Sequence, residues 1–490
     1  MDPFVVVGGD AAGLSAASKL KREDPDREVV VFEKGRWVSY AHCGTPYFVK
    51  GEVAELTDLL SLTPDEIAER GIELHREHEV TTVDTDAKTV RVEPVDSDGN
   101  AFDQPYEELL VATGGRAVSG PIEGSDLAGV FTLHGIDDAA SIRAALEPDE
   151  ATPESLGGGE FLDSAVVERY AAWEPPEKVA IVGGGYVGVE MAEAFSAHDL
   201  EVHLFQRGEH VLGPFGEAVA ERVESELREQ GVTLHLGEEV ARFSGGGGPG
   251  RGGPDDDADA DRVARLECES GAALDIDIAL VGVGIRPNVD LLADTPVELG
   301  DSGAVAVDEY GRTSVADVYA AGDCAEARHA VTGEFDWVPL GLTANRAGRA
   351  IGQTVAGDPT KTGQIAGTAV VKAFDQECGR TGITDHERAS EAGFDPVSET
   401  ITTRSRSGYY PGAAETVVSL TADRETGRLL GGTIAGTDRA AVRVDTVATA
   451  LEGNMTVDEV ERLDLAYAPP FSPVWDPILT AAKVLNGELD

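Results

Sequence analysis

A single cysteine, Cys43, is the strongest candidate for chemistry in this sequence. It lies in the stretch 39–47, SYAHCGTPY, in which a glycine and a proline follow the thiol. As a thiolate, a cysteine can attack a disulfide. The other cysteines, Cys268, Cys324 and Cys378, are too far away to form a Cys-x-x-Cys metal or dithiol motif with it. Isolated cysteines are usually small core residues, so a redox role for Cys43 requires a cofactor beside it.

The residues before Cys43 predict a dinucleotide-binding unit. The run 4–9, FVVVGG, is short, β-branched and ends in glycine, which is typical of a buried parallel strand. A helix of small residues follows, and the run 28–34, EVVVFEK, predicts the next strand. Glu33 lies 20 residues after Gly13, where an acid can accept hydrogen bonds from a ribose. The predicted cofactor-binding residues of this unit are Gly8, Gly9, Ala11, Ala12, Gly13, Glu33 and Lys34.

The glycine motif of this unit departs from the G-x-G-x-x-G pattern at one position. Residues 8–13 read GGDAAG, so Asp10 occupies the place of the middle glycine, where a pyrophosphate approaches the backbone. A carboxylate there repels phosphate unless it turns outward or is screened by cations. The sequence alone does not explain Asp10.

A second unit of the same kind spans residues 179–190, VAIVGGGYVGVE. Its predicted cofactor contacts are Gly183, Gly185, Tyr186, Val187 and Gly188. The next strand, 201–207, ends in Gln206 and Arg207 instead of an acid, which leaves room for a 2′-phosphate and supplies a cation near it. This favours NADPH over NADH. The alternative is that Arg207 is an ordinary surface residue and that either cofactor is used.

Three further apolar runs connect the two units. The runs 109–115 and 276–288 end in turns that bring the chain back past a bound nucleotide. The run 313–323 ends at Asp323, whose carboxylate can bind the hydroxyls of a flavin's ribityl chain or simply cap a helix. A flavin can pass two electrons from a nicotinamide to sulfur, and we expect its site to favour the Cys43 thiolate. The contacts assigned to these runs are Ala112, Thr113, Gly114, Gly284, Gly322 and Asp323.

The pattern changes from about residue 363. Runs 367–374, 415–420 and 429–434 predict antiparallel strands, and 442–452 predicts a helix. We therefore predict an α/β protein with two nucleotide-binding Rossmann-like domains and a C-terminal α+β domain. The predicted boundaries are 1–117 and 300–355 for a discontinuous first domain, 118–299 for the second, and 362–490 for the third.

With these features the chain resembles the single-cysteine pyridine nucleotide-disulfide oxidoreductases, and most closely the coenzyme A disulfide reductases. The resemblance implies FAD in the first domain, NAD(P)H in the second and a homodimer formed through the third. It also implies that Cys43 cycles between a thiolate and a mixed disulfide with coenzyme A. The family's Ser-Phe-x-x-Cys pattern reads SYAHC here, which makes Ser39 a catalytic residue and His42, in place of the usual asparagine, a substrate contact.

Further residues match substrate and subunit contacts of that family. Ser15, Lys19 and Arg22 share one helix face and match positions that contact coenzyme A. The alternative is a solvated helix face, but the scarcity of cations in this chain favours substrate binding. Tyr467, in the tail AYAPPFSPVW, matches the segment that reaches the partner subunit's flavin, and we assign it to the catalytic set. The pair Tyr409–Tyr410 either joins it or only packs the dimer interface.

The charge and composition of the chain limit the kinds of partner that it is expected to bind. The chain has 39 Lys and Arg against 90 Asp and Glu, a formal charge of −51, so nucleic acid and anionic membranes are not expected partners. With 41% apolar residues it should fold and carry a heavily carboxylated surface, as halophilic proteins do. The absence of a secretory signal or membrane-length apolar run predicts a cytoplasmic protein. The Gly-, Pro- and acid-rich stretches 147–176 and 244–261 predict mobile loops without chemistry.

We therefore predict a flavoprotein that uses NAD(P)H to reduce coenzyme A disulfide, or a related small disulfide, through Cys43. NADH oxidases and peroxidases share the architecture, but they commonly carry a histidine where this chain has Ala11. Reduction of polysulfide or persulfide is a closer alternative, because it uses the same nucleophile. A redox-sensing flavoprotein with little turnover is an alternative of another class.

Overall fold

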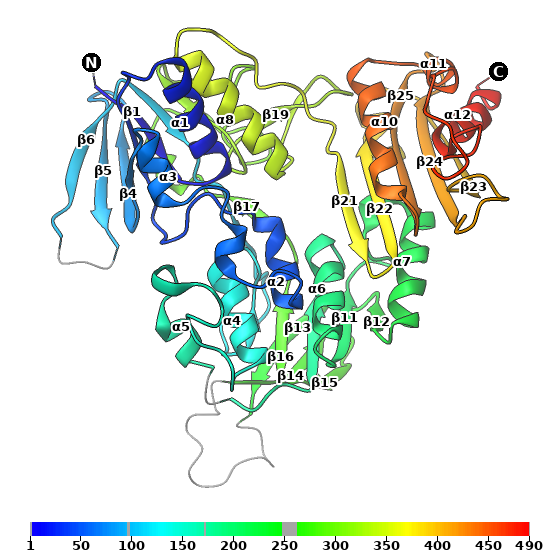
Figure 1. The fold of residues 1–490 in the computed structure, drawn as a ribbon, viewed down its shortest axis with the longest axis horizontal. Helices are drawn as coiled ribbons and strands as arrows, with labels where there is room; N and C mark the ends of the chain where they lie inside the picture. Colours follow the sequence, from blue (N-terminus) through cyan, green and yellow to red (C-terminus); the bar gives the residue numbers. More distant parts are fainter. Residues whose placement is uncertain (1, 96–98, 171–172, 247–261, 490) are drawn as a thin grey trace.

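The first nucleotide-binding unit forms a five-stranded parallel sheet in the computed structural model, which describes residues 2–95, 99–170, 173–246 and 262–489 (Figure 1). The strand order is β18-β7-β1-β2-β3. Their bounds are Phe4–Val7 for β1, Val29–Phe32 for β2, Glu73–His75 for β3, Glu108–Val111 for β7 and Val318–Ala320 for β18. All residues of β1 and β2 are buried, as predicted from their continuous apolar runs. Because β18 pairs with β7, a segment far down the chain completes this sheet.

Two helices pack closely on this sheet. Helix α1 (Ala11–Glu23) lies against α8 (Gly341–Val355). Glycines of α8 permit the approach, because a Cβ on Gly348 would lie 2.0 Å from the carbonyl oxygen of Ala12. A small antiparallel sheet flanks the unit. It is formed by β4 (His78–Asp84), β5 (Thr89–Pro94) and β6 (Phe102–Pro105), and α3 spans Pro64–Glu69.

The second unit repeats the arrangement, with strand order β12-β11-β10-β16-β9 and parallel pairing throughout. The bounds are β9 Val130–Phe131, β10 Lys178–Val182, β11 Glu201–Gln206, β12 Thr233–Leu236 and β16 Ile278–Val281. Its helices are α4 (Ile136–Leu146), α6 (Tyr186–Ser196) and α7 (Glu217–Glu229). The other strands are β13 (Val240–Gly245), β14 (Val263–Cys268) and β15 (Ala273–Asp275), together with the pair β8 (Gly115–Ala117) and β17 (Ile285–Pro287) between the two units.

The C-terminal part is an antiparallel sheet with helices, at the right of Figure 1, so the predicted α+β class is confirmed. Its strand order is β21-β22-β25-β24-β23. The bounds are Ala369–Ala373, Gln376–Gly382, Pro396–Arg404, Glu415–Asp423 and Leu429–Gly436 for β21 to β25 in sequence order. Helices α9 (His386–Glu391), α10 (Ala440–Glu452), α11 (Val457–Glu461) and α12 (Pro477–Gly487) complete it, and β19 (Ala327–Arg328) pairs with β20 (Phe335–Asp336) ahead of it. In the described ranges no helix is both long and apolar enough to cross a membrane.

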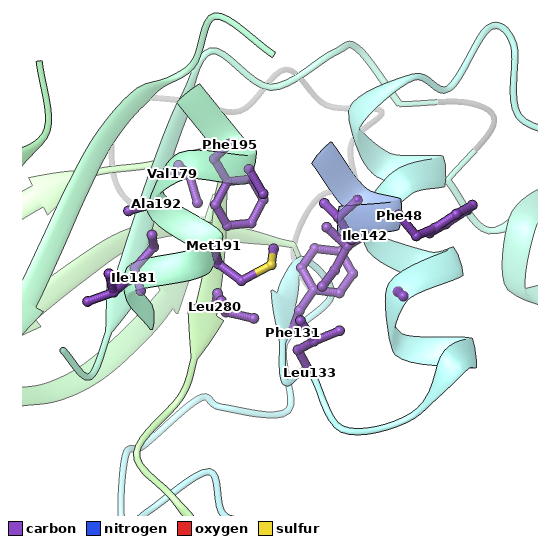
Figure 2. Packing of buried hydrophobic residues seen from close by; sticks show 14 of the residues in the cluster. Phe48, Phe131, Leu133, Ile142, Val179, Ile181, Met191, Ala192, Phe195 and Leu280 are labelled. Atoms are coloured by element: carbon purple, nitrogen blue, oxygen red, sulfur yellow. The ribbon is translucent and has the colours of Figure 1, made fainter. Parts of the chain in front are cut away.

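The short helix α2 (Thr45–Lys50) connects the cysteine segment to the second unit. It packs against α4 and α6, and Phe48 and Val49 are buried there. Figure 2 shows Phe48 near Ile142 of α4, with Met191 and Phe195 projecting from α6 into the same core. The residues just after Cys43 are thus held by the second nucleotide-binding unit.

The prediction of a mobile loop at 147–176 is wrong. This stretch contains α5 (Ser164–Glu168), and Leu156, Leu162 and Tyr170 are buried in the core that includes Phe131. Its larger apolar side chains, among them Leu156, Leu162, Val167 and Tyr170, are buried in a core that other elements also form, so low average hydrophobicity did not leave the segment unpacked. Of the stretch 244–261, all but the first residues lie outside the described part of the chain.

Candidate active site

Cys43 is the one exposed cysteine of the four, and Cys268, Cys324 and Cys378 are buried. It lies in a 3₁₀ turn, His42–Gly44, directly before α2. The turn is closely packed, because a Cβ on Gly44 would lie 2.3 Å from Leu59 Cδ2. Ser39 precedes it in a left-handed conformation, with φ 53°, and its backbone N–H donates to the carbonyl of Gly9 at 3.0 Å. The backbone therefore ties the cysteine segment to the first glycine motif.

The protein groups around Cys43 oppose the thiolate, so the stabilisation that we expect at this site is left to the flavin. Partial burial raises the pKa of the thiol, and the carboxylates of Glu190 and Asp323 raise it further. Glu190 has no predicted role in the sequence. It ends the second glycine motif on α6, and its Oε1 accepts a hydrogen bond from the Tyr47 hydroxyl of α2 at 3.0 Å. A thiolate at Cys43 must therefore gain its stabilisation from groups that bind beside it.

Glu190 is a carboxyl group that titrates near neutrality. Burial is the largest cause of the shift and raises the pKa of Glu190 to about 7, although the hydrogen bond from the Tyr47 hydroxyl acts in the opposite direction. Its neighbour Glu193 is held as a carboxylate by Lys50 at 2.7 Å and Lys372 at 2.5 Å, which lower its pKa against the effect of burial. On helix α6, Glu193 is thus kept ionised, whereas Glu190 is divided between its protonated and ionised forms near pH 7.

Replacing Glu190 with glutamine should lower the pKa of Cys43, because it removes a negative charge beside the thiol. The difference should be greatest above pH 7, where Glu190 of the unaltered protein is ionised. The rate of iodoacetamide alkylation of the reduced enzyme, measured against pH, should rise about threefold to tenfold on the acidic limb of the thiol titration. A matched control is Glu52→Gln, which removes an exposed carboxylate paired with Lys50. Equal alkylation profiles for both variants would contradict the assignment.

The first glycine motif forms a tight strand–turn–helix junction. Gly8 has φ 113°, and a Cβ there would lie 2.1 Å from the carbonyl oxygen of Ala112. A Cβ on Gly13 would lie 2.0 Å from the carbonyl oxygen of Gly8. The Glu33 carboxylate accepts the Gly9 N–H at 2.8 Å and the Gly35 N–H at 2.7 Å. This fixed acid beside the turn fits the ribose of a dinucleotide.

The second motif reproduces this geometry with one chemical difference. A Cβ on Gly183 would lie 2.3 Å from the carbonyl oxygen of Gly282, while Gly185 has nothing within 4 Å and leaves the turn open. The position of Glu33 is taken by Gln206, whose Oε1 accepts the Gly184 N–H at 3.0 Å. The Arg207 side chain is 80% exposed and lies 3.6 Å from Glu239. The site therefore has a neutral amide and an exposed cation where the first site has an acid.

The connecting runs meet between the two units. Asp323 is largely buried, and burial raises the pKa of its carboxyl. Asn288 has no predicted role in the sequence, but its Nδ2 donates to the carbonyls of Thr113 at 2.9 Å and Gly115 at 2.8 Å. This amide joins the two crossing segments. Of the other predicted contacts, Lys34 is exposed, Gly114 has φ 66°, and Gly284 has φ 126° with nothing within 4 Å of a Cβ.

The predicted coenzyme A contacts on α1 are not equivalent in the structure. The Ser15 hydroxyl donates to Asn345 Oδ1 at 2.7 Å. Lys19 is buried and pairs with Glu23, so its charge is already neutralised. Arg22 is exposed and has no side-chain hydrogen bond or ion pair among the residues that the structure describes. Arg22 is therefore the cation on this face that is available to a phosphate.

The predicted C-terminal aromatics are exposed. Tyr467 lies between α11 and α12 with 48% of its surface accessible, and Tyr409 is 77% accessible. A hydrogen bond to Tyr409 raises the pKa of Tyr467. Phe471 and Trp475 of the same tail are also exposed. This segment presents a polar and aromatic surface to whatever lies outside the chain.

Two Rossmann folds that share a chain, with a reachable cysteine and partly buried acids where they meet, define a two-nucleotide redox enzyme. The sequence profile of the pyridine nucleotide-disulphide oxidoreductases matches residues 2–348, and the profile of that family's dimerisation domain matches residues 368–477. The chain belongs to the pyridine nucleotide-disulphide oxidoreductases.

Relatives within this family act on sulfur or on oxygen. The NAD(P)H coenzyme A polysulfide/persulfide reductase of Pyrococcus horikoshii is 38% identical over 98% of each chain. The coenzyme A disulfide reductase of Staphylococcus haemolyticus is 28% identical over 96% of each. Among solved structures, an NAD-dependent persulfide reductase from A. fulgidus matches with a TM-score of 0.87 and 32% identity, over 99% of this chain and 83% of the other.

These findings confirm the predicted fold class and cofactor classes. The enzyme is an FAD-dependent NAD(P)H:disulfide oxidoreductase. The first motif, with its close glycines and fixed Glu33, fits FAD, and the second, with Gly185 open, fits the nicotinamide cofactor. When bound, FAD supplies the two-electron transfer between nicotinamide and sulfur.

Proposed function

We propose that this enzyme uses NAD(P)H to reduce the sulfur–sulfur bond of coenzyme A disulfide through Cys43. The observation that carries the proposal is the exposure of this one thiol on the turn that joins the two nucleotide-binding units. The Cys43 thiolate attacks one sulfur of the disulfide, forms a mixed disulfide and releases one coenzyme A thiolate, which takes up a proton. Two electrons from NAD(P)H then cleave the mixed disulfide, so that the second thiol leaves and Cys43 is regenerated.

Ser39 and Tyr467 are proposed to act beside Cys43, and His42 and Ser15 beside the substrate. Ser39 is buried next to the cysteine turn, and Tyr467 is exposed for use by a partner subunit. We propose a homodimer formed through the dimerisation domain, in which the tyrosine of one subunit reaches the site of the other. The charge of −51 further suggests a cytoplasm of high salt concentration, where a carboxylated surface stays hydrated.

Polysulfide or persulfide is a second candidate substrate, favoured by the 38% identity to the Pyrococcus horikoshii enzyme. The same thiolate attack on a sulfur–sulfur bond applies to it. Oxidase or peroxidase activity is less favoured, because position 11 of the first glycine motif is alanine instead of the histidine common in those relatives. The imidazole that does lie beside the motif, that of His42, is paired with Asp10.

A substrate panel in molar salt tests the proposal. Coenzyme A disulfide, polysulfide, peroxide and oxygen should be compared with NADPH and with NADH under the same conditions. We expect kcat/KM to be highest for a sulfur substrate. Faster turnover with oxygen or peroxide would overturn the proposal, and reduction of the flavin without turnover of any acceptor would favour the redox sensor.

Replacing Arg22 with alanine should raise the KM for coenzyme A disulfide about tenfold, because it removes the available cation on α1. The KM for a small uncharged disulfide should change less than twofold. Arg265→Ala is a matched control, since it removes an arginine paired with Asp275 on the outer sheet of the second unit. Equal effects of Arg22→Ala on the two disulfides would remove this residue from the substrate site.

A further inference from the structure

Two departures from the expected motifs meet in the structure. The Asp10 carboxylate, which replaces the middle glycine, binds His42 Nε2 of the cysteine turn, and the two residues are 32 positions apart. The other ring nitrogen, His42 Nδ1, lies 3.0 Å from the backbone carbonyl oxygen of His134. We propose that Asp10 and His42 form a matched ion pair that holds the Cys43 turn on the phosphate-binding motif and neutralises Asp10 where the FAD diphosphate binds.

The partners of His42 favour the charged form of its ring. A carboxylate and a carbonyl oxygen both accept hydrogen bonds, so both ring nitrogens must donate, and only the imidazolium form can do this. Tyr40 stacks on the ring with centroids 4.2 Å apart. The charged and titratable groups that face it are Asp10, Asp323 and His134. The two carboxylates and the backbone carbonyl of His134 favour the imidazolium. Burial lowers the pKa of the His134 ring, and the charge on His42 lowers it further.

The carboxylate of Asp10 is directed away from its own helix. Asp10 is the N-cap residue of α1, yet its side chain makes no capping hydrogen bond in the described structure. Its Oδ1 instead accepts the Tyr40 N–H at 3.1 Å, and its Oδ2 binds His42. The helix N–H groups thus remain available to a phosphate. The carboxylate is both turned outward and screened, which are the conditions under which an acid is tolerated at this position.

The pair also fixes the cysteine turn. A backbone bond from Ser39 to Gly9 joins the turn to the motif in any sequence, but the two further bonds require the side chain of Asp10. Because both side chains are partly exposed, the ion pair contributes little to global stability. Its effect is local, on the position of the turn and on the charge near the diphosphate. This makes Asp10 and His42 positioning residues.

A double-mutant cycle on FAD binding tests the pairing, using His42→Asn, Asp10→Gly and the double variant. His42→Asn leaves an uncompensated carboxylate near the diphosphate, so the Kd of FAD should rise about tenfold in low salt and recover in molar salt. In the Asp10→Gly background the same change should alter Kd less than twofold. The Kd of FAD in each background is measured by titrating the apoprotein with FAD and following the FAD fluorescence. Equal effects of His42→Asn in the two backgrounds would overturn the proposal.

A matched control shows whether the effect is specific to the Asp10–His42 pair or follows from the loss of any nearby imidazole ring. His134→Asn removes the neighbouring ring but keeps the backbone carbonyl that His42 uses, so it should change the Kd of FAD much less than His42→Asn. If a variant binds FAD too weakly for its Kd to be compared, the Tm of its apoprotein, measured against pH, provides a second test of the pair. A His134→Asn defect as large as that of His42→Asn, with the same salt dependence, would also overturn the pairing.

The pH dependence of the apoprotein has a defined sign. Burial opposes the charge on His42, but the hydrogen bond and charge of Asp10 outweigh it, and its pKa is raised. The pair's contribution is therefore complete below the unfolded-state pKa of histidine and is lost as pH rises through the raised folded-state pKa. Because the pair contributes little to global stability, the Tm difference between the unaltered chain and Asp10→Asn/His42→Asn should be small, and it should shrink over this range. A difference independent of pH would contradict the ion pair. None of these measurements uses a disulfide substrate, so they stand apart from the proposed function.

Discussion

Replacing Cys43 with serine should lower turnover of coenzyme A disulfide by about 10³-fold or more, because a hydroxyl cannot act as the attacking thiolate. Flavin reduction by NADPH should continue at close to its normal rate, since hydride transfer from the nicotinamide to the flavin does not use the thiol. Stopped-flow absorbance of the flavin and steady-state release of coenzyme A thiol measure the two halves separately. If release of coenzyme A thiol is lost while flavin reduction is retained, the defect lies at the sulfur step.

The control for this experiment is Cys268→Ala. Cys268 is buried on β14 in the second unit, so this substitution removes a thiol without touching the cysteine turn. It should retain turnover within about twofold, with at most a small loss of stability from the vacated volume. If Cys43→Ser kept more than a tenth of normal disulfide turnover, Cys43 would not be the nucleophile and the proposed function would fail.

The elements that hold the nucleotides were predictable because their signals are local. A short β-branched run that ends in glycine specified β1 and β10, since a buried parallel strand followed by a tight turn has few other compatible sequences. The close contacts of Gly8 and Gly183 with carbonyl oxygens explain why glycine is needed at these turns. The spacing from Gly13 to Glu33 likewise reflects one helix and one strand.

The parts that sequence reasoning missed depend on contacts between distant segments. Tyr47 and Glu190 are 143 residues apart and meet only because α2 packs on α6. Asp10 was an unexplained departure until its partner His42 was placed beside it. Helical spacing put Lys19 on a face with Arg22, but spacing cannot reveal that the chain around Lys19 buries it. Each miss concerns the surroundings of a side chain, which a linear pattern does not contain.

Replacing Arg207 with alanine should raise the KM for NADPH about 10-fold to 100-fold and leave the KM for NADH within about twofold. The reason is that the guanidinium is the available cation beside the second motif, and a charge-assisted bond to a phosphate contributes ~1.5–3 kcal/mol. Its contact with Glu239 is long and solvent-exposed, so little is lost when Arg207 turns to a ligand. Steady-state kinetics with both cofactors in the same buffer measure the ratio of the KM for NADPH to the KM for NADH.

The reciprocal change is Gln206→Glu. Gln206 and Glu33 accept the same backbone N–H in their respective motifs, so the variant rebuilds in the second unit the acid of the first. A carboxylate there accepts hydrogen bonds from the 2′-hydroxyl of NADH and repels the 2′-phosphate of NADPH. The preference should therefore move toward NADH by a factor similar to that of Arg207→Ala, while Arg242→Ala, on β13 of the same unit, should leave it unchanged. Equal losses with both cofactors in Arg207→Ala would mean that this arginine orients the site as a whole and does not select the phosphate.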